Sequence, residues 1–290
     1  MTAAVGMRRP ATAGTSARWA RTALRTLLIV VVCLVVVFPI YWMAVAAVQP
    51  TASTLRYPPS LVPTSFDLSG FRDVFANLPI LRWLSNSAVL AVVTTVITVV
   101  LSVLGGYVLS ALYWPGKALF GLLLLVTQMM PEAVVIIPVF QLYNDLHLVQ
   151  SLIALAFLHA AFVLPVGVWI LRSAMDGVPA EVREAALIDG CGHVSVLRRI
   201  VLPLTVPAVI AVGIVAFFAS WGEYLFAVTM ISDSDKYPAS VGLATLIGQL
   251  DTPVQQLLAG GLVYALPPVV LFVLVQRHIV AGLTAGAVKG

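Results

Sequence analysis

The sequence predicts an all-α membrane protein with six transmembrane helices. Of its 290 residues, 61% are hydrophobic and only 10% are charged, and the mean hydropathy is +1.04. In soluble domains the charged share is about a quarter. A helix needs about 20 apolar residues to cross the hydrocarbon core of a bilayer, and runs of that kind recur six times. Because no segment alternates with period two, as the strands of a membrane barrel do, helices are the expected spanning elements.

The predicted spans lie at roughly 26–48, 85–113, 117–143, 151–173, 205–231 and 257–279. Residues 1–22 are expected to form a disordered cytoplasmic leader, and residues 23–290 the transmembrane domain. The first apolar run is long and has no small-residue cleavage site, so it is interpreted as a retained span and not as a signal peptide. The Pro-rich stretch 49–83 is expected to be an extracytoplasmic loop with one short helical turn at 71–75.

The distribution of basic residues predicts the orientation of these spans. Twelve of the sixteen Lys and Arg residues fall on one side of the six-span arrangement and four on the other. Loops rich in Lys and Arg stay in the cytoplasm, so both termini and the loop 176–203 are expected there, in a multi-pass protein of the cell membrane. The basic residues are spread over four loops without aromatic residues between them, which argues against nucleic-acid binding.

Several spans carry features of a packed and kinked bundle. The second span contains Asn86, Ser87 and three threonines, which suit close helix packing. Pro131 and Pro138 are expected to break the third span, and Pro267-Pro268 the sixth. These breaks suit either simple packing geometry or a moving translocation pathway.

Two carboxylates inside the predicted spans, Glu132 and Glu223, are candidates for function. A charge at membrane depth costs about 2.5–3.5 kcal/mol on insertion scales and therefore usually faces a bundle interior or a cavity. Together with Trp221 and Tyr224, these two residues are candidate lining of a translocation path. The alternatives are a proton carrier and an interhelical hydrogen bond that fixes packing.

Signatures of catalysis are missing from the sequence. It has no H-E-x-x-H, no G-x-S-x-G, no Cys/His spacing of a metal site and no phosphate-binding G-x-x-x-x-G-K-[ST] loop. Cys33 and Cys191 are expected to be free thiols in a reducing compartment. No enzymatic activity and no cofactor are expected in this chain, and any ATP that drives it must be bound by another chain.

The loop at 176–203 is polar and lies between two strongly apolar runs. Pro179 and Glu181 suit the start of a helix, and Val182, Ala185, Ala186 and Ile188 are expected to share a compact face. Asp189-Gly190 should end that helix, because glycine adopts left-handed geometry without strain. A second short helix is expected at about 195–201. Such a helix pair suits insertion into a groove of another protein, and the alternative is an amphipathic hairpin on lipid headgroups.

This loop resembles the E-A-A loop of the permeases of ABC importers. The matching residues are Glu184-Ala185-Ala186, then Gly190, then Ile200-x-Leu202-Pro203. Further matches resemble the carbohydrate-importer branch, the maltose-type inner-membrane permeases. They are Asn86-Ser87, the run Gln128–Pro131, Leu164-Pro165, Trp221-x-Glu223-Tyr224-Leu225 and the ending Gly282–Gly290.

The resemblance implies a type I ABC importer permease fold and an ATP-driven sugar importer of which this chain forms half of the translocation path. The implied partners are a second homologous permease, a cytoplasmic ATPase dimer that holds ATP and magnesium, an extracytoplasmic sugar-binding protein and the membrane lipid. The implied ATPase-coupling residues are Glu184, Ala185, Ala186, Asp189, Gly190, Ile200, Leu202 and Pro203. The rival hypotheses are a secondary transporter driven by an ion gradient and a membrane scaffold that recruits a soluble enzyme.

Overall fold

Every element in the described part of the chain is a helix. The structure is a computed structural model that describes residues 13–58, 60–63, 65–247 and 252–287. Its elements are α1 (Ala13–Ala47), α2 (Thr51–Thr54), α3 (Ser69–Asn77), α4 (Ile80–Ala111), α5 (Lys117–Thr127), α6 (Glu132–Asp145), α7 (Leu152–Asp176), α8 (Ala180–Ile188), α9 (His193–Val196), the π-helical turn η1 (Leu197–Val201), α10 (Leu202–Trp221), α11 (Leu225–Met230), the 3-10 turn η2 (Ser234–Lys236), α12 (Ala239–Ile247) and α13 (Val254–Ala287).

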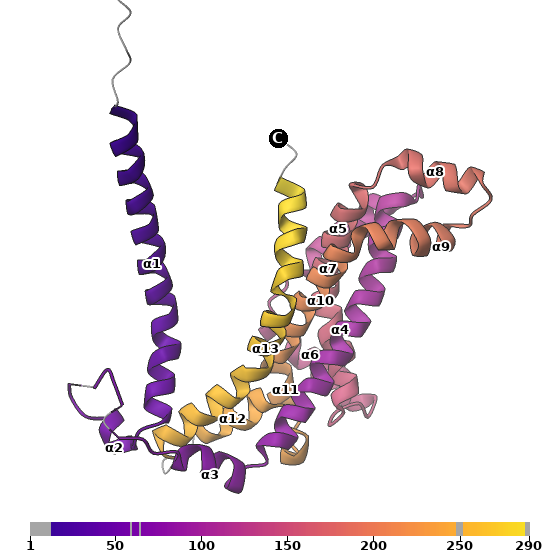
Figure 1. Ribbon diagram of the computed structural model, residues 1–290. Coiled ribbons are helices and arrows are strands. Elements are labelled where there is room, and N and C mark those ends of the chain that lie inside the picture. Colours follow the sequence, from indigo (N-terminus) through magenta and orange to yellow (C-terminus); the bar gives the residue numbers. More distant parts are fainter. Residues whose placement is uncertain (1–12, 59, 64, 248–251, 288–290) are drawn as a thin grey trace, which may run out of the picture.

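The all-α membrane fold is confirmed. Five helices of the described chain are long and apolar enough to cross a membrane, and α5 with α6 makes a sixth span if the bent pair counts as one. The axes of α5 and α6 differ by 100° across the break at residues 128–131, which includes Pro131. The third span is therefore interrupted and not merely kinked. By contrast, α13 is a single helix that contains Pro267 and Pro268, so the sixth span is not interrupted there, although the helix bends along its length (Figure 1).

Other boundaries differ from those expected. The first helix begins at Ala13, so residues 13–22 of the expected leader are helical, whereas residues 1–12 lie outside the described residues. The expected turn at 71–75 is part of the longer helix α3. The fifth span ends at Trp221, and residues 222–224 separate it from α11.

The centre of the bundle is the packing of α4 against α7 and α10. A cluster of buried side chains at one end includes Tyr107 of α4, Leu171 and Met175 of α7 and Val212 of α10. Small residues allow the helices to approach closely. A Cβ atom added to Gly167 of α7 would lie 2.3 Å from Ser102 Oγ of α4, which leaves no room for a side chain. This is the close helix packing that small and hydroxyl-bearing residues predict.

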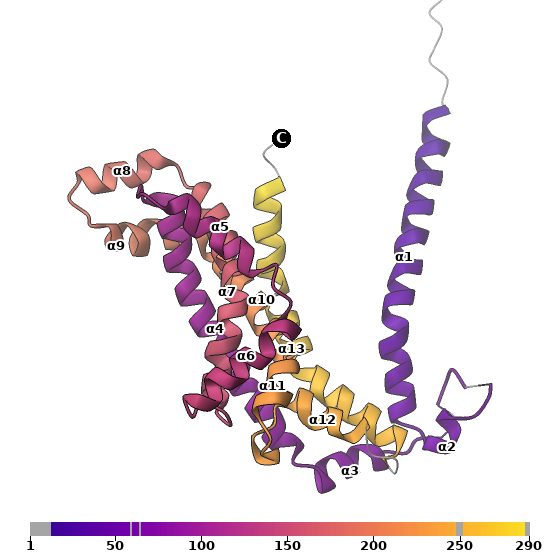
Figure 2. The same cartoon turned by 180° about the vertical axis from the view of Figure 1, so that it is seen from behind.

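Figures 1 and 2 show how the ends of the bundle differ. The helix pair α8–α9 projects from one end, and the N-terminal end of α1 and the C-terminal end of α13 lie at that same end. Helices α2, α3 and α12 lie at the opposite end. In both views α1 stands apart from α4, α7 and α10, and most of its described side chains are exposed.

Candidate functional site

The projecting helix pair α8–α9 is the first of two candidate sites. The helix α8 ends in a hydrogen-bond pattern in which Cys191 N–H donates to the Ala186 carbonyl at 3.0 Å and Gly190 N–H to the Leu187 carbonyl at 3.1 Å. Gly190 has a φ of 85°, the left-handed geometry that this C-terminal motif requires. The expected turn at Gly190 is therefore confirmed. The second helix begins at His193, two residues before its expected start, and continues through η1 into α10.

The two faces of α8 have different environments. Glu184, Ala185, Asp189 and Gly190 are exposed. Ala186 is buried instead against the cluster of Tyr107 and Leu171, so it does not share the exposed face that the sequence predicted for it. The tip of the helix pair exposes two large apolar residues, Ile188 (86%) and Val194 (79%), on either side of the exposed Asp189 and His193.

The remaining expected coupling residues lie behind this surface. Ile200 packs against the same buried cluster as Ala186, Leu202 is half-buried, and Pro203 is exposed in the first turn of α10. Arg183 of α8 donates from Nη1 to Ser110 Oγ of α4 at 3.3 Å. These contacts fix the helix pair to α4, α7 and α10.

The second candidate site is a pocket of about 350 Å³ between α6, α7 and the break after α10. Three of the candidate path-lining residues, Glu132, Glu223 and Tyr224, line this pocket. His159 and Phe162 of α7 also line it and were not predicted as site residues. The sequence signal that points to His159 is a single imidazole in an otherwise apolar stretch of the fourth span.

Glu223 has a structural role within this pocket. Its two carboxylate oxygens accept hydrogen bonds from the backbone N–H groups of Phe226 at 2.7 Å and Ala227 at 2.9 Å. It therefore satisfies the first turn of α11, whose amides have no partner within the helix. The side chain is only 5% exposed. The carboxylate caps the helix that directly follows it in the chain, and these two bonds do not join distant spans.

Trp221 does not line the pocket, contrary to expectation. It is 4% exposed and is stacked between Phe217 and Tyr264, with ring centroids 5.6 and 5.7 Å away. The Tyr264 hydroxyl donates to the Trp221 carbonyl at 2.7 Å. These contacts stabilise the end of α10 against α13, so Trp221 supports the break that presents Glu223 and Tyr224.

The bundle of membrane-spanning helices, the projecting helix pair and the break after α10 agree with one class of protein, the permease subunits of ABC importers. The chain belongs to the family described as "binding-protein-dependent transport system inner membrane component", whose model matches residues 102–284. This confirms the expected family and makes the chain a multi-pass transport subunit. It also decides against the gradient-driven transporter and the scaffold.

Relatives of known name support the same assignment. The chain is 31% identical to the inner membrane ABC transporter permease protein YcjP of Escherichia coli, over 89% of this chain and 92% of that protein. It is 32% identical to the arabinooligosaccharides transport system permease protein AraQ of Halalkalibacterium halodurans (89% and 93% covered). It is also 32% identical to the trehalose/maltose transport system permease protein MalG of Thermococcus litoralis (91% and 94% covered).

One solved structure shows the same fold. It is a crystal structure of a bacterial ABC transporter involved in the import of the acidic polysaccharide alginate. The match has a TM-score of 0.77 at 20% identity and covers 93% of this chain and 99% of the matched chain. The type I importer permease fold expected from the sequence is thereby confirmed.

Proposed function

We propose that this chain is the permease subunit of an ATP-driven carbohydrate importer, forms half of the translocation path and is coupled to its ATPase through α8–α9. The observation that carries the proposal is the geometry of α8. An exposed surface with Glu184 and Ala185, ended by the left-handed Gly190, projects from the bundle while Ala186 anchors it beneath. A rigid helix whose tip exposes large apolar side chains is suited to a groove on a partner protein.

The substrate class is inferred from the relatives. Two of the proteins that match this chain along almost its whole length are named for the transport of arabinooligosaccharides and of trehalose or maltose. The polar groups that line the pocket between α6 and α7 can hydrogen-bond to solutes that are rich in hydroxyl groups, as sugars are. We therefore assign Glu132, Glu223 and Tyr224 to the lining of this half of the path.

The proposed partners follow from surfaces that this chain leaves uncovered. The tip of α8–α9 would contact one subunit of a cytoplasmic ATPase dimer, which would hold ATP and magnesium. The apolar surface of α1 would pack against a second, homologous permease and lipid. An extracytoplasmic sugar-binding protein would meet the opposite end, where α2 and α3 lie.

The proposed orientation places α8 and both ends of the described chain in the cytoplasm. Arg172, Arg183, Arg198 and Arg199 lie on or beside the helix pair, which agrees with the positive-inside rule. The C-terminal tail Gly282–Gly290, which matches the ending of the carbohydrate-importer permeases, would lie near the ATPase; its side chains are not described, and residues 288–290 lie outside the described residues.

Uptake by the reconstituted complex tests this function. Proteoliposomes that contain both permeases, the ATPase and the binding protein are loaded with ATP and offered a panel of radiolabelled mono-, di- and oligosaccharides. We expect uptake of at least one carbohydrate, and we expect it to disappear when either ATP or the ATPase is omitted. Uptake that persists without ATP under an ion gradient would contradict the proposal, and so would a complex that hydrolyses ATP but takes up none of the carbohydrates.

A further inference from the structure

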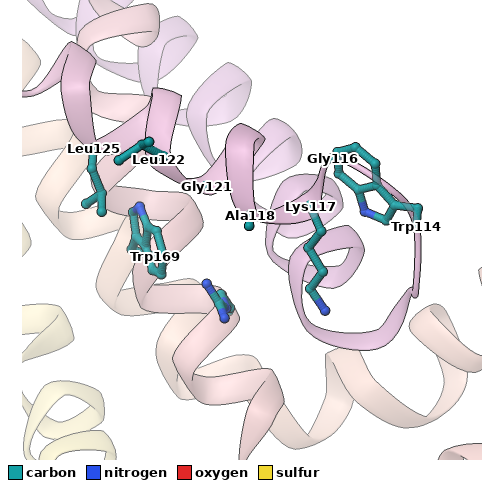
Figure 3. Close-up of a pocket in the computed structure, with 9 residues that line it drawn as sticks. Trp114, Gly116, Lys117, Ala118, Gly121, Leu122, Leu125 and Trp169 are labelled. Carbon is teal, nitrogen blue, oxygen red and sulfur yellow. The ribbon is translucent and has the colours of Figure 1, made fainter.

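A second cavity lies away from the central pocket, between the start of α5 and the end of α7. It has a volume of about 590 Å³. Figure 3 shows Lys117 beside Trp114 at one end of the cavity and Leu122 and Leu125 beside Trp169 at the other. The cavity is at the same end of the bundle as α8, because α7 leads directly into that helix.

Positive charge is concentrated at this cavity. Its lining in the described part of the chain includes two cations, Lys117 and Arg172, and no carboxylate. Lys117 Nζ is held at the α4–α5 junction, where it donates to the carbonyls of Leu112 at 3.2 Å and Ser110 at 3.5 Å. These bonds position the ammonium group without neutralising its charge.

The guanidinium of Arg172 is also held in place. It stacks over the Trp169 ring at 4.7 Å, and its Nε lies 3.6 Å from the carboxylate of Asp176. That ion pair is long, and the Asp176 side chain is 50% exposed, so it competes only weakly for the cation. Two cations from separate helices therefore face one space that is large enough for a phosphate group.

The other end of the cavity is apolar. Leu122 and Leu125 are 56% and 48% exposed on α5, a helix that belongs to the bent third span. Trp114 lies beside Lys117, and Trp169 lies beside Leu122 and Leu125 with the Arg172 guanidinium over its ring (Figure 3). Tryptophan prefers the boundary between headgroups and hydrocarbon. A ligand that satisfies both ends has an anionic head and an apolar tail.

We propose that this cavity binds the phosphodiester headgroup of an anionic phospholipid, with Lys117 and Arg172 on the phosphate and an acyl chain along Leu122 and Leu125. The assignment to the cytoplasmic leaflet rests on the orientation given under the proposed function. A free phosphate ion has the same charge chemistry but would leave the apolar end unfilled. Basic pockets at the cytoplasmic end of membrane helices suit lipid headgroups for this reason.

Native mass spectrometry of the full-length chain in detergent tests the proposal by counting retained lipids during titration with dioleoylphosphatidylglycerol. Dioleoylphosphatidylcholine is the comparison lipid with a zwitterionic headgroup. Sodium phosphate is the comparison ligand that has no acyl chain. The test variant is Lys117→Gln/Arg172→Gln. The matched control is Arg21→Gln/Arg25→Gln, which removes two exposed positive charges from α1.

We expect the wild type and the α1 control to bind phosphatidylglycerol about thirtyfold more tightly than the Lys117/Arg172 variant, because each of the two basic residues near a membrane surface contributes about 1 kcal/mol. Equal binding by all three proteins would overturn the proposal. Displacement of the lipid by millimolar sodium phosphate would show a phosphate site and overturn the lipid assignment. Equal affinity for phosphatidylcholine would also contradict it.

A second variant tests the cavity without changing charge. A Cβ atom at Gly121 would meet Trp169 Cζ2 at an ordinary 3.5 Å, so Gly121→Ala should fold and bind, whereas the longer side chain of Gly121→Leu should fill the cavity and displace the lipid. Undiminished binding by Gly121→Leu would contradict the assigned cavity. Lipid counts are independent of sugar uptake, so failure of the lipid site and failure of the proposed function are distinguishable.

Discussion

Glu223 shows how one side chain at membrane depth serves the local structure. Its carboxylate accepts two backbone N–H groups of α11, and it is the residue at which the chain turns after α10. A glutamine retains one of the two acceptor oxygens, and an alanine retains neither. The effect of substitution should therefore follow the number of acceptors that remain.

We predict that Glu223→Ala destabilises the protein by about 0.5–2 kcal/mol, the usual range for loss of a helix cap. Glu223→Gln should lose less. Thermal unfolding of the purified protein, followed by circular dichroism, measures both. Wild-type stability in Glu223→Ala would show that the carboxylate does not support α11.

Asp67 gives a pH-dependent prediction outside the membrane. The Ser69 N–H donates to Asp67 Oδ1 at 2.8 Å, and this bond holds the pKa of the carboxyl below its ordinary value of 3.8. Because the folded-state pKa is depressed, the ionised carboxylate stabilises the fold above the ordinary pKa, and that contribution is lost as pH falls through the folded-state pKa.

We therefore expect the unfolding temperature of Asp67→Asn to lie below that of the wild type at neutral pH and to converge with it as the solution is acidified below 3.8. The asparagine can still accept the Ser69 hydrogen bond but does not titrate, so it isolates the effect of the charge. A difference between the two proteins that stays constant across this range would contradict the assignment.

At the scale of elements, the contact between α4 and α7 leaves no space at Gly167. A Cβ atom there would lie 2.3 Å from Ser102 Oγ and 3.0 Å from Val212 Cγ1. Gly213 on α10 is a matched control, because its nearest neighbour would be an ordinary 3.7 Å away.

We predict that Gly167→Ala destabilises the bundle by about 1–3 kcal/mol through overpacking, whereas Gly213→Ala is tolerated. The comparison uses the temperature at which each variant loses its elution peak in size-exclusion chromatography after heating. Equal behaviour of the two variants would mean that α4 and α7 separate easily at this point.

Much of this arrangement was predictable from the sequence. Hydropathy located the second span at 85–113 against the observed Ile80–Ala111, and the glycine of the E-A-A segment predicted the left-handed turn. Both depend on local properties of the chain. The burial of Ala186 was not predictable, because it depends on Tyr107 and Leu171, which are distant in sequence.

The breaks in the third and fifth spans were also only partly predictable from the sequence. Proline predicted an interruption near residue 131 but not its angle of 100°, which depends on how α5 and α6 pack against the bundle. The break after Trp221 has no proline. It depends on capping by Glu223 and on the stacking of Trp221 with Tyr264, a contact between two spans.

At the scale of the whole molecule, α1 is the least supported element. Only 6% of its most apolar stretch is buried within the chain, against 50% for α7. A helix in that position contributes little to the stability of this chain unless another protein covers it.

We expect co-expression with the homologous permease to raise the unfolding temperature of this chain, since a partner that binds only the folded state stabilises it by mass action. Differential scanning fluorimetry of the chain alone and of the co-purified pair measures the shift. An unchanged unfolding temperature would indicate that lipid alone covers α1.

We infer that α8–α9 couples ATP hydrolysis by the partner ATPase to sugar transport. Sugar uptake and ATP hydrolysis measured together in the same proteoliposomes test this coupling. The complex is reconstituted with wild-type chain, with Glu184→Lys, with Gly190→Pro and with Glu181→Lys as a control that reverses a charge elsewhere on α8. At equal amounts of inserted protein, we predict that Glu184→Lys and Gly190→Pro lose uptake per ATP hydrolysed while the control retains it. Wild-type uptake by Glu184→Lys and Gly190→Pro would contradict the claim.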